Sequence, residues 1–453
     1  MSLPRYEDYK DSGVSWLGNV PAHWRVLRLK YACMVFPSNV DKHSRDDEPS
    51  VRLCNYTDVY YNERITADMK FMEASASKDQ VAKFTLKAGD TVITKDSETA
   101  DDIAIAAYVP DDLPGVVCGY HLSVVRPFPG TSGAFVKRLF DSVYAKARFA
   151  VAANGLTRVG LGQYALDNVE LPFPPVEEQT VIATFLDRET AKIDTLIAEQ
   201  ESLITLLAEK RQATISHAVT KGLDPDALMK DSGVAWLGEV PAHWDVATFQ
   251  RHVYVQEGQV NPEAEPYRSM LLIAPNHIEP GTARLVYLET AREQSAESGK
   301  YLCKSGDVIY SKIRPALRKV CIAPEDCLCS ADMYPLRGTS TLSNPFLKWF
   351  MLSEPFSALA VLESERVAMP KINRESLKAV WMPIPTPQEQ EAIDFFLLTE
   401  TGKLDALKDK ASRAIKLLAE RRSALIAAAV TGQMDVRGAI LQAAVESPEP
   451  LAA

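Results

Sequence analysis

The sequence predicts a mixed α/β (α+β) fold in which two similar domains are separated by an antiparallel two-helix coiled coil. The first observation is a 15-residue segment that occurs twice, at Lys10–Trp24 and Lys230–Trp244, with 13 identical positions. The second is a long helical pattern in each half of the chain. Because 453 residues exceed what one ordinary core encloses, these observations predict two domains and a pseudo-twofold internal repeat.

A second pair of matching segments marks the end of each domain. Pro172–Gln179 and Pro383–Gln390 both end in Glu-Gln, and each leads into a helical stretch that closes on Ala-Val-Thr. Between these markers the halves share faint patterns, such as Ala88–Lys95 and Ser305–Lys312, which both resemble a turn followed by a short apolar strand. The matches predict a first domain at 1–175, a first helix at 176–222, a second domain at 223–385, a second helix at 386–435 and a C-terminal tail at 436–453.

The two helical stretches carry a seam with steps of three and four residues, which is typical of a coiled coil. Only short links, at 222–229 and 383–388, join the helices to the second domain, so the helices are expected to run antiparallel. Two separate amphipathic helices are the alternative, but polar Gln200 and Lys210 would sit poorly in a domain core. The seam is predicted to contain Ile193, Leu196, Leu203 and Leu207 in the first helix, and Leu404, Leu407, Leu418 and Leu425 in the second.

The net negative charge of the chain is concentrated between two large blocks of the sequence. The formal net charge is −10, yet residues 25–175 (block 1) hold 18 basic and 19 acidic residues, and residues 245–385 (block 2) hold 16 of each. Residues 176–244 hold 6 basic and 12 acidic residues. Near-neutral blocks permit contact with nucleic acid, but strong binding to phosphates would then come largely from partner subunits.

Composition and motifs exclude several classes of protein. No segment approaches 18 consecutive apolar residues and the polar N-terminus has no signal-peptide core, so a cytoplasmic protein without membrane contact is expected. The one close pair of cysteines, Cys327 and Cys329, lacks the paired spacing of a zinc site. Phosphate-loop, methyltransferase and nuclease motifs do not occur. We therefore expect no catalytic residue, no cofactor and no metal site.

The repeated segments resemble those of a known family, the specificity subunits of type I restriction–modification systems. Lys-Asp-Ser-Gly-Val-x-Trp-Leu-Gly-x-Val-Pro-x-His-Trp is similar to the start of that family's target-recognition domains. The Pro-rich segments that end in Glu178-Gln179 and Glu389-Gln390 are similar to the start of its helical spacers. The resemblance covers residues 6–435, twice in the same order. Residues 438–453 have no counterpart in it.

The resemblance implies a non-catalytic subunit with two recognition domains, each reading one half of a split site on double-stranded DNA. It also implies that the helices dock two methyltransferase subunits, which an ATP-dependent translocase and nuclease subunit joins. The recognition subunit of a type II-like (IIB/IIG) enzyme is one alternative. A coiled-coil scaffold that does not bind DNA is another.

The candidate DNA contacts lie in loops at matching places in the two blocks. In block 2 a strand leads into a loop with four cations in eight residues, and arginine forks of this kind bind guanine edges or phosphates. An ordinary solvated loop is the alternative. Lysine, arginine and asparagine just before the helices are further candidates for phosphate contacts. The candidates are Lys95, Ser97, Thr99 and Arg158 in block 1, and Lys312, Arg314, Arg318, Lys319, Lys371 and Asn373 in block 2.

Overall fold

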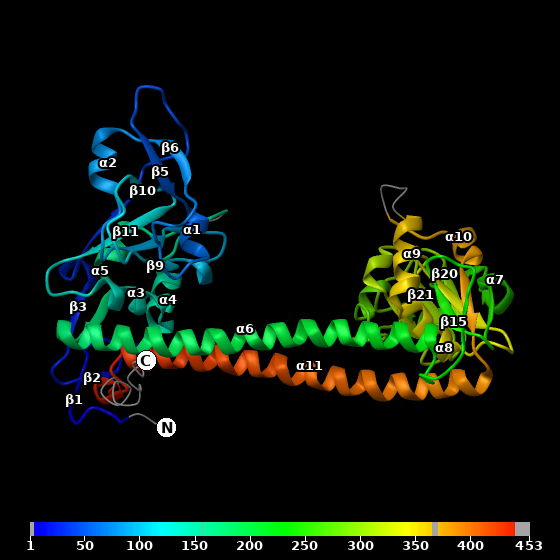
Figure 1. Cartoon of the computed structure of the whole chain (residues 1–453). Helices are drawn as coiled ribbons and strands as arrows, with labels where there is room; N and C mark the ends of the chain where they lie inside the picture. The colour runs from blue at the N-terminus through cyan, green and yellow to red at the C-terminus, as the bar shows by residue number, and fades with distance from the viewer. Residues whose placement is uncertain (1–3, 156, 365–369, 440–453) are drawn as a thin grey trace, which may run out of the picture. The chain divides into compact units, whose positions relative to one another are not determined.

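The computed structural model describes residues 4–155, 157–364 and 370–439, and it separates into two compact units (Figure 1). Unit 1 contains residues 1–199 and 414–453, and unit 2 contains residues 200–413. Block 1 therefore lies in unit 1 and block 2 in unit 2. Most of the predicted C-terminal tail, residues 440–453, lies outside the described residues.

Unit 1 is built on a four-stranded antiparallel sheet in the order β4-β11-β7-β9, beside a three-stranded sheet in the order β10-β5-β6. The predicted strand at 88–95 is β7, whose four residues are all buried. The strands are β1 (Tyr9–Asp11), β2 (Asn19–Pro21), β3 (Arg25–Arg28), β4 (Cys33–Pro37), β5 (Ser50–Cys54), β6 (Met72–Ser75), β7 (Thr91–Thr94), β8 (Asp96–Ser97), β9 (Ala106–Tyr108), β10 (Val116–Cys118), β11 (Leu122–Pro127), β12 (Val159–Gly160) and β13 (Glu170–Phe173). The short helices are α1 (Tyr56–Tyr60), α2 (Lys78–Phe84), α3 (Gly133–Asp141), α4 (Val143–Ala152) and α5 (Gln163–Asn168).

Unit 2 repeats the four-stranded sheet as β17-β24-β21-β22, so the two blocks share one framework. Its second sheet, β18-β20-β23-β19, differs from that of unit 1. The strands are β14 (Met229–Asp231), β15 (Glu239–Pro241), β16 (Asp245–Thr248), β17 (Val253–Val255), β18 (Gln259–Val260), β19 (Leu272–Ile273), β20 (Lys300–Cys303), β21 (Val308–Ser311), β22 (Val320–Ile322), β23 (Cys327–Cys329), β24 (Met333–Gly338) and β25 (Trp381–Ile384). The short helices are α7 (Phe249–His252), α8 (Asn344–Leu352), α9 (Glu354–Ser364) and α10 (Arg374–Ala379).

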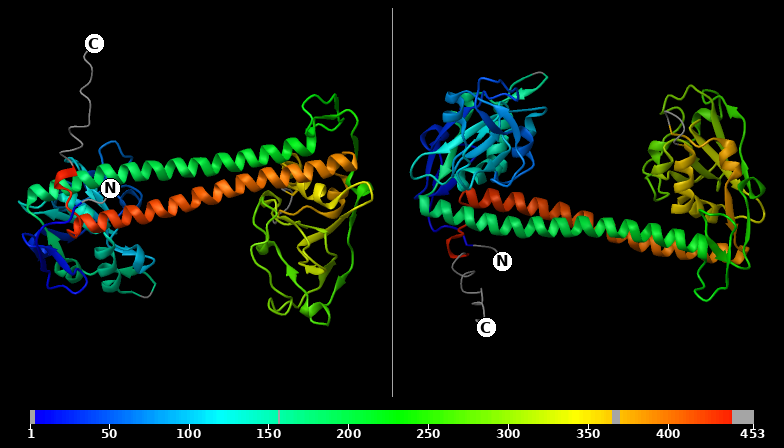
Figure 2. Two further views of the ribbon diagram at one scale, coloured as in Figure 1. Left: turned by 90° about the horizontal axis from the view of Figure 1, so that it is seen from below. Right: turned by 45° about the horizontal axis from the view of Figure 1, so that its top comes forward.

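Two long helices, α6 (Val176–Lys221) and α11 (Pro387–Val430), contribute to both units. In unit 1 the start of α6 and the end of α11 both bind the N-terminal segment, because Tyr6 donates to Glu178 and Tyr9 donates to the carbonyl of Gly432. Further along, Asp194 of α6 pairs with Arg422 of α11. The two helices are therefore antiparallel in this unit, and Figure 2 shows them side by side.

Unit 2 contains the same arrangement at the other ends of the helices. Gly222, directly after α6, lies against the ring of Trp244, whose Nε1 donates to Glu389 in the first turn of α11. Arg211 of α6 pairs with Asp405 further along α11. The helices are therefore antiparallel here too, which confirms the predicted mixed α/β fold with a coiled coil.

The repeated Pro-Ala-His-Trp and Glu-Gln segments bind each other, which explains why both occur twice. Trp24 is fully buried, and its Nε1 donates to Glu178 over 3.0 Å while His23 Nε2 lies 2.8 Å from the same carboxylate. Gln179 accepts a hydrogen bond from the backbone of Ser132 and donates to that of Pro174. The same contacts recur in unit 2 through His243, Trp244, Glu389 and Gln390.

Burial of Glu389 opposes its ionisation, but hydrogen bonds from Trp244, His243 and Thr386 outweigh that effect and lower its pKa to about 2. The helix therefore begins with a carboxylate that the adjoining domain stabilises in its charged form. These hydrogen bonds attach the start of α11 to the segment that leads into block 2.

The buried and half-buried residues of the two helices form a stripe with the predicted steps of three and four residues. Some members of this stripe lie one position after the predicted residue, so the order of the steps differs. The prediction and the structure share Ile193 and Leu207 on α6 and Leu404 on α11, all of which are buried. Leu196, Leu203 and Leu407 are instead 44%, 41% and 47% exposed. The residue after each is half-buried: Ile197, Ile204 and Lys408. The two other predicted seam residues of α11, Leu418 and Leu425, are half-buried.

This difference has a local cause. Leu196–Ile197 and Leu203–Ile204 are adjacent apolar pairs. A step of three or of four residues therefore reaches an apolar side chain in either case, and the sequence does not decide between them. On α11 the covered residue is Lys408 because its ammonium group pairs with Glu279 of block 2.

Candidate nucleic-acid interface

The candidate residues of block 1 come together at the end of β7. The chain continues from Lys95 into β8 (Asp96–Ser97), which pairs antiparallel with β12 (Val159–Gly160). This pairing brings Arg158 next to the β7–β8 turn, where its Nη2 lies 3.6 Å from Asp96 Oδ1. Residues more than 60 positions apart therefore share one edge of the block.

The four predicted residues of block 1 differ in how they could meet a ligand. Lys95 is half-buried; its ammonium group donates to the carbonyl of Ser38 and lies 4.3 Å from the centre of the Tyr120 ring. Burial lowers the pKa of Lys95. Ser97 is 2% exposed, whereas Thr99 and Arg158 are exposed. Thr99 and Arg158 are thus the two predicted residues whose side chains are open to solvent.

Three further residues of the same edge, Asp96, Tyr120 and His121, are not among the candidate DNA contacts named from the sequence. Asp96 accepts a hydrogen bond from His121 Nδ1, which lies 2.9 Å from Oδ2, and it also attracts Arg158. His121 and Tyr120 come from the connection between β10 and β11 and are 43% and 51% exposed. No local pattern marks this connection, because only the folding of β7 against β11 brings it beside Asp96.

The candidate residues of block 2 also converge. Ile313 forms a bridge with Lys371, and the backbone amide of Arg314 donates to the carbonyl of Pro370. The loop after β21 and the segment before α10 are therefore joined, just as the loop after β7 joins the segment before α5 in block 1.

Three of the four cations in the block 2 loop already have protein partners. Lys312 donates to the carbonyl of Ala331 over 2.6 Å, and Lys319 donates to that of Pro275 over 2.5 Å. The guanidinium of Arg318 binds Glu354 and Ser357 on α9. These contacts hold the loop in one conformation. They leave these groups less available to a ligand.

Arg314 and Lys371 are the exposed cations at this edge, and neither side chain has a hydrogen bond or ion pair with the residues that the structure describes. Arg314 adopts the left-handed conformation, with φ 47°, directly before the 3-10 turn Pro315–Leu317. Asn373 caps α10, because its Oδ1 accepts from the amide of Ser376 over 2.8 Å. Arg314 and Lys371 are therefore the stronger candidates, and Asn373 has a structural role.

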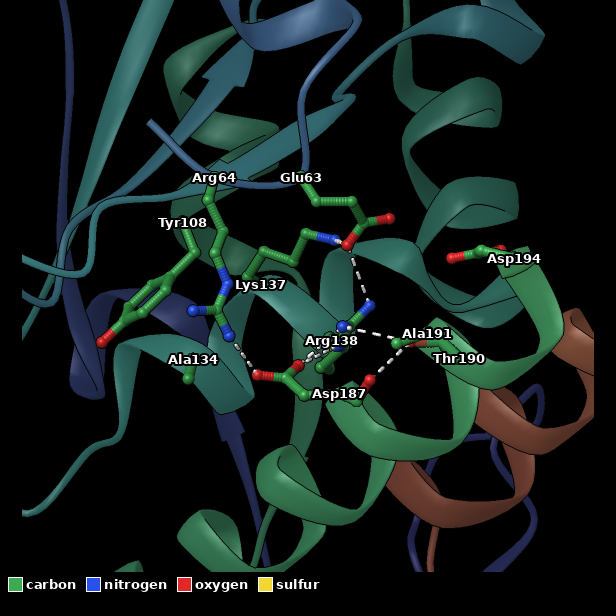
Figure 3. A pocket seen from close by; sticks show the side chains of 10 residues that line it. All are labelled: Glu63, Arg64, Tyr108, Ala134, Lys137, Arg138, Asp187, Thr190, Ala191 and Asp194. Atoms are coloured by element: carbon green, nitrogen blue, oxygen red, sulfur yellow. Dashed lines mark hydrogen bonds and ion pairs between the residues drawn. The ribbon is translucent and has the colours of Figure 1, made fainter. Parts of the chain in front are cut away.

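A pocket of about 270 Å³ in unit 1 contains a network of ion pairs (Figure 3). Arg138 donates to Glu63 on one side and to Asp187 of α6 on the other, and Arg64 also binds Asp187. Lys137 and Arg138 are 4% and 7% exposed. Burial opposes ionisation of Glu63, but the neighbouring cations outweigh it and lower its pKa to about 2. These groups satisfy one another, so the network attaches block 1 to α6.

The long helices offer a second type of surface, because several large apolar side chains on them are exposed. Phe395 is 75% exposed, Leu417 65% and Leu206 58%, together with Leu196, Leu203, Leu398 and Leu407. Exposed apolar side chains that gather on an element indicate a surface for another protein.

Within residues 4–155, 157–364 and 370–439 we find no cluster of three or more His, Cys, Asp or Glu side chains suited to holding a metal ion. The seven cysteines are free and buried, and burial is the principal cause of the raised pKa of Cys33 and Cys118. No helix of the described chain has the length and apolar character needed to cross a membrane.

Comparison with known proteins agrees with this architecture. The family model for the type I restriction modification DNA specificity domain matches residues 51–205. The EcoDI type I restriction enzyme specificity subunit of Escherichia coli is 28% identical over 284 residues, which cover 59% of this chain and 63% of that protein. The match thus spans less than two thirds of that relative.

Two further comparisons cover more of the chain. The MjaX type I restriction enzyme specificity subunit of Methanocaldococcus jannaschii is 21% identical over 383 residues, or 83% of this chain and 86% of that one. A chain from a structure describing assembly and conformational transition of the type I R-M system has the same fold, with a TM-score of 0.67 and 16% identity, over 91% of this chain and 98% of that one. The chain is therefore similar in sequence to type I restriction enzyme specificity subunits, and it shares the fold of a chain from a type I restriction–modification system.

Proposed function

We propose that this chain reads a bipartite site on double-stranded DNA, with the domain at 1–175 reading one half and the domain at 223–385 reading the other. The observation that carries the proposal is a shared framework with different exposed side chains at the same edge. Block 1 presents Arg158 and Thr99 there, and block 2 presents Arg314 and Lys371. Two domains that share a fold can read different sequences only through different contact residues.

The proposal assigns phosphate contact to the exposed cations and leaves catalysis to partners. Arg314 and Lys371 offer guanidinium and ammonium groups that have no hydrogen bond or ion pair with the described part of the chain. Blocks with almost no net charge provide few further phosphate contacts. Affinity for DNA then depends on subunits that add positive surface. The helices at 176–222 and 386–435 dock two methyltransferase subunits, and an ATP-dependent translocase and nuclease subunit joins this complex in the cytoplasm.

The exposed apolar residues of the long helices support docking. Leu196, Leu203 and Leu407 each expose more than two fifths of their surface, whereas the residue after each is half-buried. Large apolar side chains in such positions gain free energy when a partner covers them. The paired helices therefore retain exposed apolar surface that a second protein can cover.

Block exchange tests the reading of two half-sites. Residues 245–380 are replaced by the matching block of a relative that methylates a different sequence, and the complex with its methyltransferase is assayed by sequencing methylated DNA. We expect one half-site to change and the other to stay the same, because each block has its own core. A change in both half-sites would contradict independent reading.

Binding measurements test the role of the partner. The isolated chain is expected to bind DNA weakly, and the complex with methyltransferase subunits to bind one bipartite sequence specifically. Both are titrated against the same duplex at several salt concentrations, since affinities depend steeply on salt. Tight specific binding by the isolated chain, unchanged by the partner, would contradict the proposal. Copurification from the native host then distinguishes a type I complex, which contains a motor nuclease, from a type II-like one.

A further inference from the structure

The connection between β10 and β11 in block 1, Gly119–His121, is held rigidly beside the candidate DNA-binding edge. The amide of Gly119 donates to the carbonyl of Cys54, and the amide of Lys95 donates to the carbonyl of His121 over 3.0 Å. A Cβ atom on Gly119 would lie 2.8 Å from the carbonyl oxygen of Cys54, so only glycine permits this approach. The connection therefore presents its side chains from a fixed backbone.

His121 is oriented by a specific partner. Its Nδ1 lies 2.9 Å from Oδ2 and 3.0 Å from Oδ1 of Asp96. A carboxylate only accepts hydrogen bonds, so Nδ1 carries the hydrogen in this contact. In the neutral ring Nε2 is then an acceptor. The ring is 43% exposed, and Nε2 has no hydrogen-bond partner among the residues that the structure covers.

The same position differs in block 2 although its backbone contact is the same. There the amide of Lys312 donates to the carbonyl of Asp332 over 3.0 Å, which matches the contact of Lys95 with His121. The side chain is a carboxylate instead of an imidazole, and the residue after the lysine is Ile313 instead of Asp96. The framework is thus kept while the exposed group changes, as expected of a position that reads sequence.

We propose that His121, oriented by Asp96, reads one base pair in the half-site bound by block 1. Its Nε2 accepts a hydrogen bond from an exocyclic amino group of adenine or cytosine at the edge of the major groove, where these groups distinguish the bases. The assignment rests on the proposed reading of DNA by block 1. Arg158, whose Nη2 lies 3.6 Å from Oδ1 of the same Asp96, would then contact a neighbouring phosphate.

The test selects bound duplexes from a library randomised over both half-sites, using the chain in complex with its methyltransferase. His121→Ala is expected to reduce discrimination at one base pair of the block 1 half-site by about tenfold and to leave all other positions unchanged. Asp96→Ala is expected to weaken discrimination at the same base pair, because the ring is no longer held. His121→Gln, whose amide oxygen is also an acceptor, is expected to retain part of it.

Two controls make the outcome specific. Tyr164, 82% exposed on α5 of the same block, is replaced by alanine and should leave the selected sequences unchanged. Asp332→Ala, at the matching position of block 2, should not alter the block 1 half-site. Thermal unfolding of each variant confirms that it is folded, which is expected because His121 is exposed.

Several outcomes would overturn the inference. One is a folded His121→Ala complex that selects the wild-type sequence with full discrimination. Another is an equal loss of affinity for all sequences, which would show a phosphate contact only. A change in the block 2 half-site would also contradict it. If the wild-type complex selects no bipartite sequence, the proposed function itself fails, and that result is distinct from the others.

Discussion

Arg422 of α11 donates from Nε to Asp194 of α6 over 2.8 Å, and its Nη2 also reaches Glu63 of block 1 over 2.6 Å. Arg211, at the matching position of α6, binds Asp405 of α11 and two backbone carbonyls of block 2. In each unit one arginine therefore connects three elements: its own helix, the opposite helix and the block. The sequence repeat therefore places the same arginine–aspartate contact between the two helices in both units.

Arg422→Ala is expected to destabilise unit 1 by about 1–2 kcal/mol, because the side chain is 23% exposed and its loss removes the ion-pair partner of Asp194 and one of the three cations that bind Glu63. Arg421→Ala is the matched control, since Arg421 is exposed and adjacent on the same helix. Urea unfolding of both variants measures the difference. Equal midpoints would show that the ion pairs contribute nothing measurable.

Two neighbouring leucines of α6 test the phase of the helix pair. Leu207 is 9% exposed and Leu206 is 58% exposed. Leu207→Ala should cost about 2–4 kcal/mol of unfolding free energy, because it leaves a cavity, whereas Leu206→Ala should stay within about 0.5 kcal/mol. Chemical unfolding of unit 2 gives both values, and a larger loss for Leu206→Ala would contradict the covered stripe.

The pKa of Glu389 predicts a dependence of stability on pH. The folded protein holds this pKa at about 2, below the ordinary value of 4.5. Its stabilising contribution is therefore complete above the unfolded pKa and is lost as the pH falls from about 4.5 toward 2. Glu389→Gln should be less stable than the wild type at about pH 7, and the difference should shrink at about pH 3.

Glutamine keeps an acceptor oxygen for Trp244 but loses the second oxygen, which accepts from Thr386, so only the pH-dependent part of the difference reports on the charge. Urea midpoints at the two pH values measure the effect, with Glu391→Gln, an exposed neighbour on α11, as the control. A difference between wild type and Glu389→Gln that is independent of pH would exclude this role for the carboxylate.

If the long helices set the spacing of the proposed half-sites, lengthening both should lengthen the unread gap. Seven residues inserted after Glu199 and after Lys416 keep the 3.5-residue period, and these positions face each other in the register of Asp194 with Arg422. The insertion adds about 10 Å of helix, or about three base pairs of DNA. Sequencing of methylated DNA should show the longer gap with both half-sites preserved.

The matched control lengthens α6 alone. It shifts the two helices out of register and should abolish activity instead of changing the gap. An active complex with both insertions and an unchanged gap would show that the helices do not determine the spacing.

Much of the fold follows from local sequence because local rules govern it. An apolar run after a turn with glycine determines the strand at 88–95 and its counterpart at 305–312. Apolar periodicity determines both long helices. The contacts of Trp24 with Glu178 and of Trp244 with Glu389 could be expected as a pair, since both partners recur in the same order. The candidate site was only partly predictable. Lysine and arginine residues can be found by inspection, but whether their charges have partners depends on the fold.

By itself the sequence determined that the chain has two copies of one framework, because a repeated segment must form repeated structure when its local preferences are the same. Only the tertiary structure decided which residue of Leu203 and Ile204 faces the opposite helix, because both satisfy the period. It also decided that Lys312 and Lys319 bind carbonyl groups while Arg314 stays exposed. Likewise it placed His121 against Asp96. These outcomes depend on contacts between residues far apart in the chain, and such contacts form only when the strands pair and the helices pack.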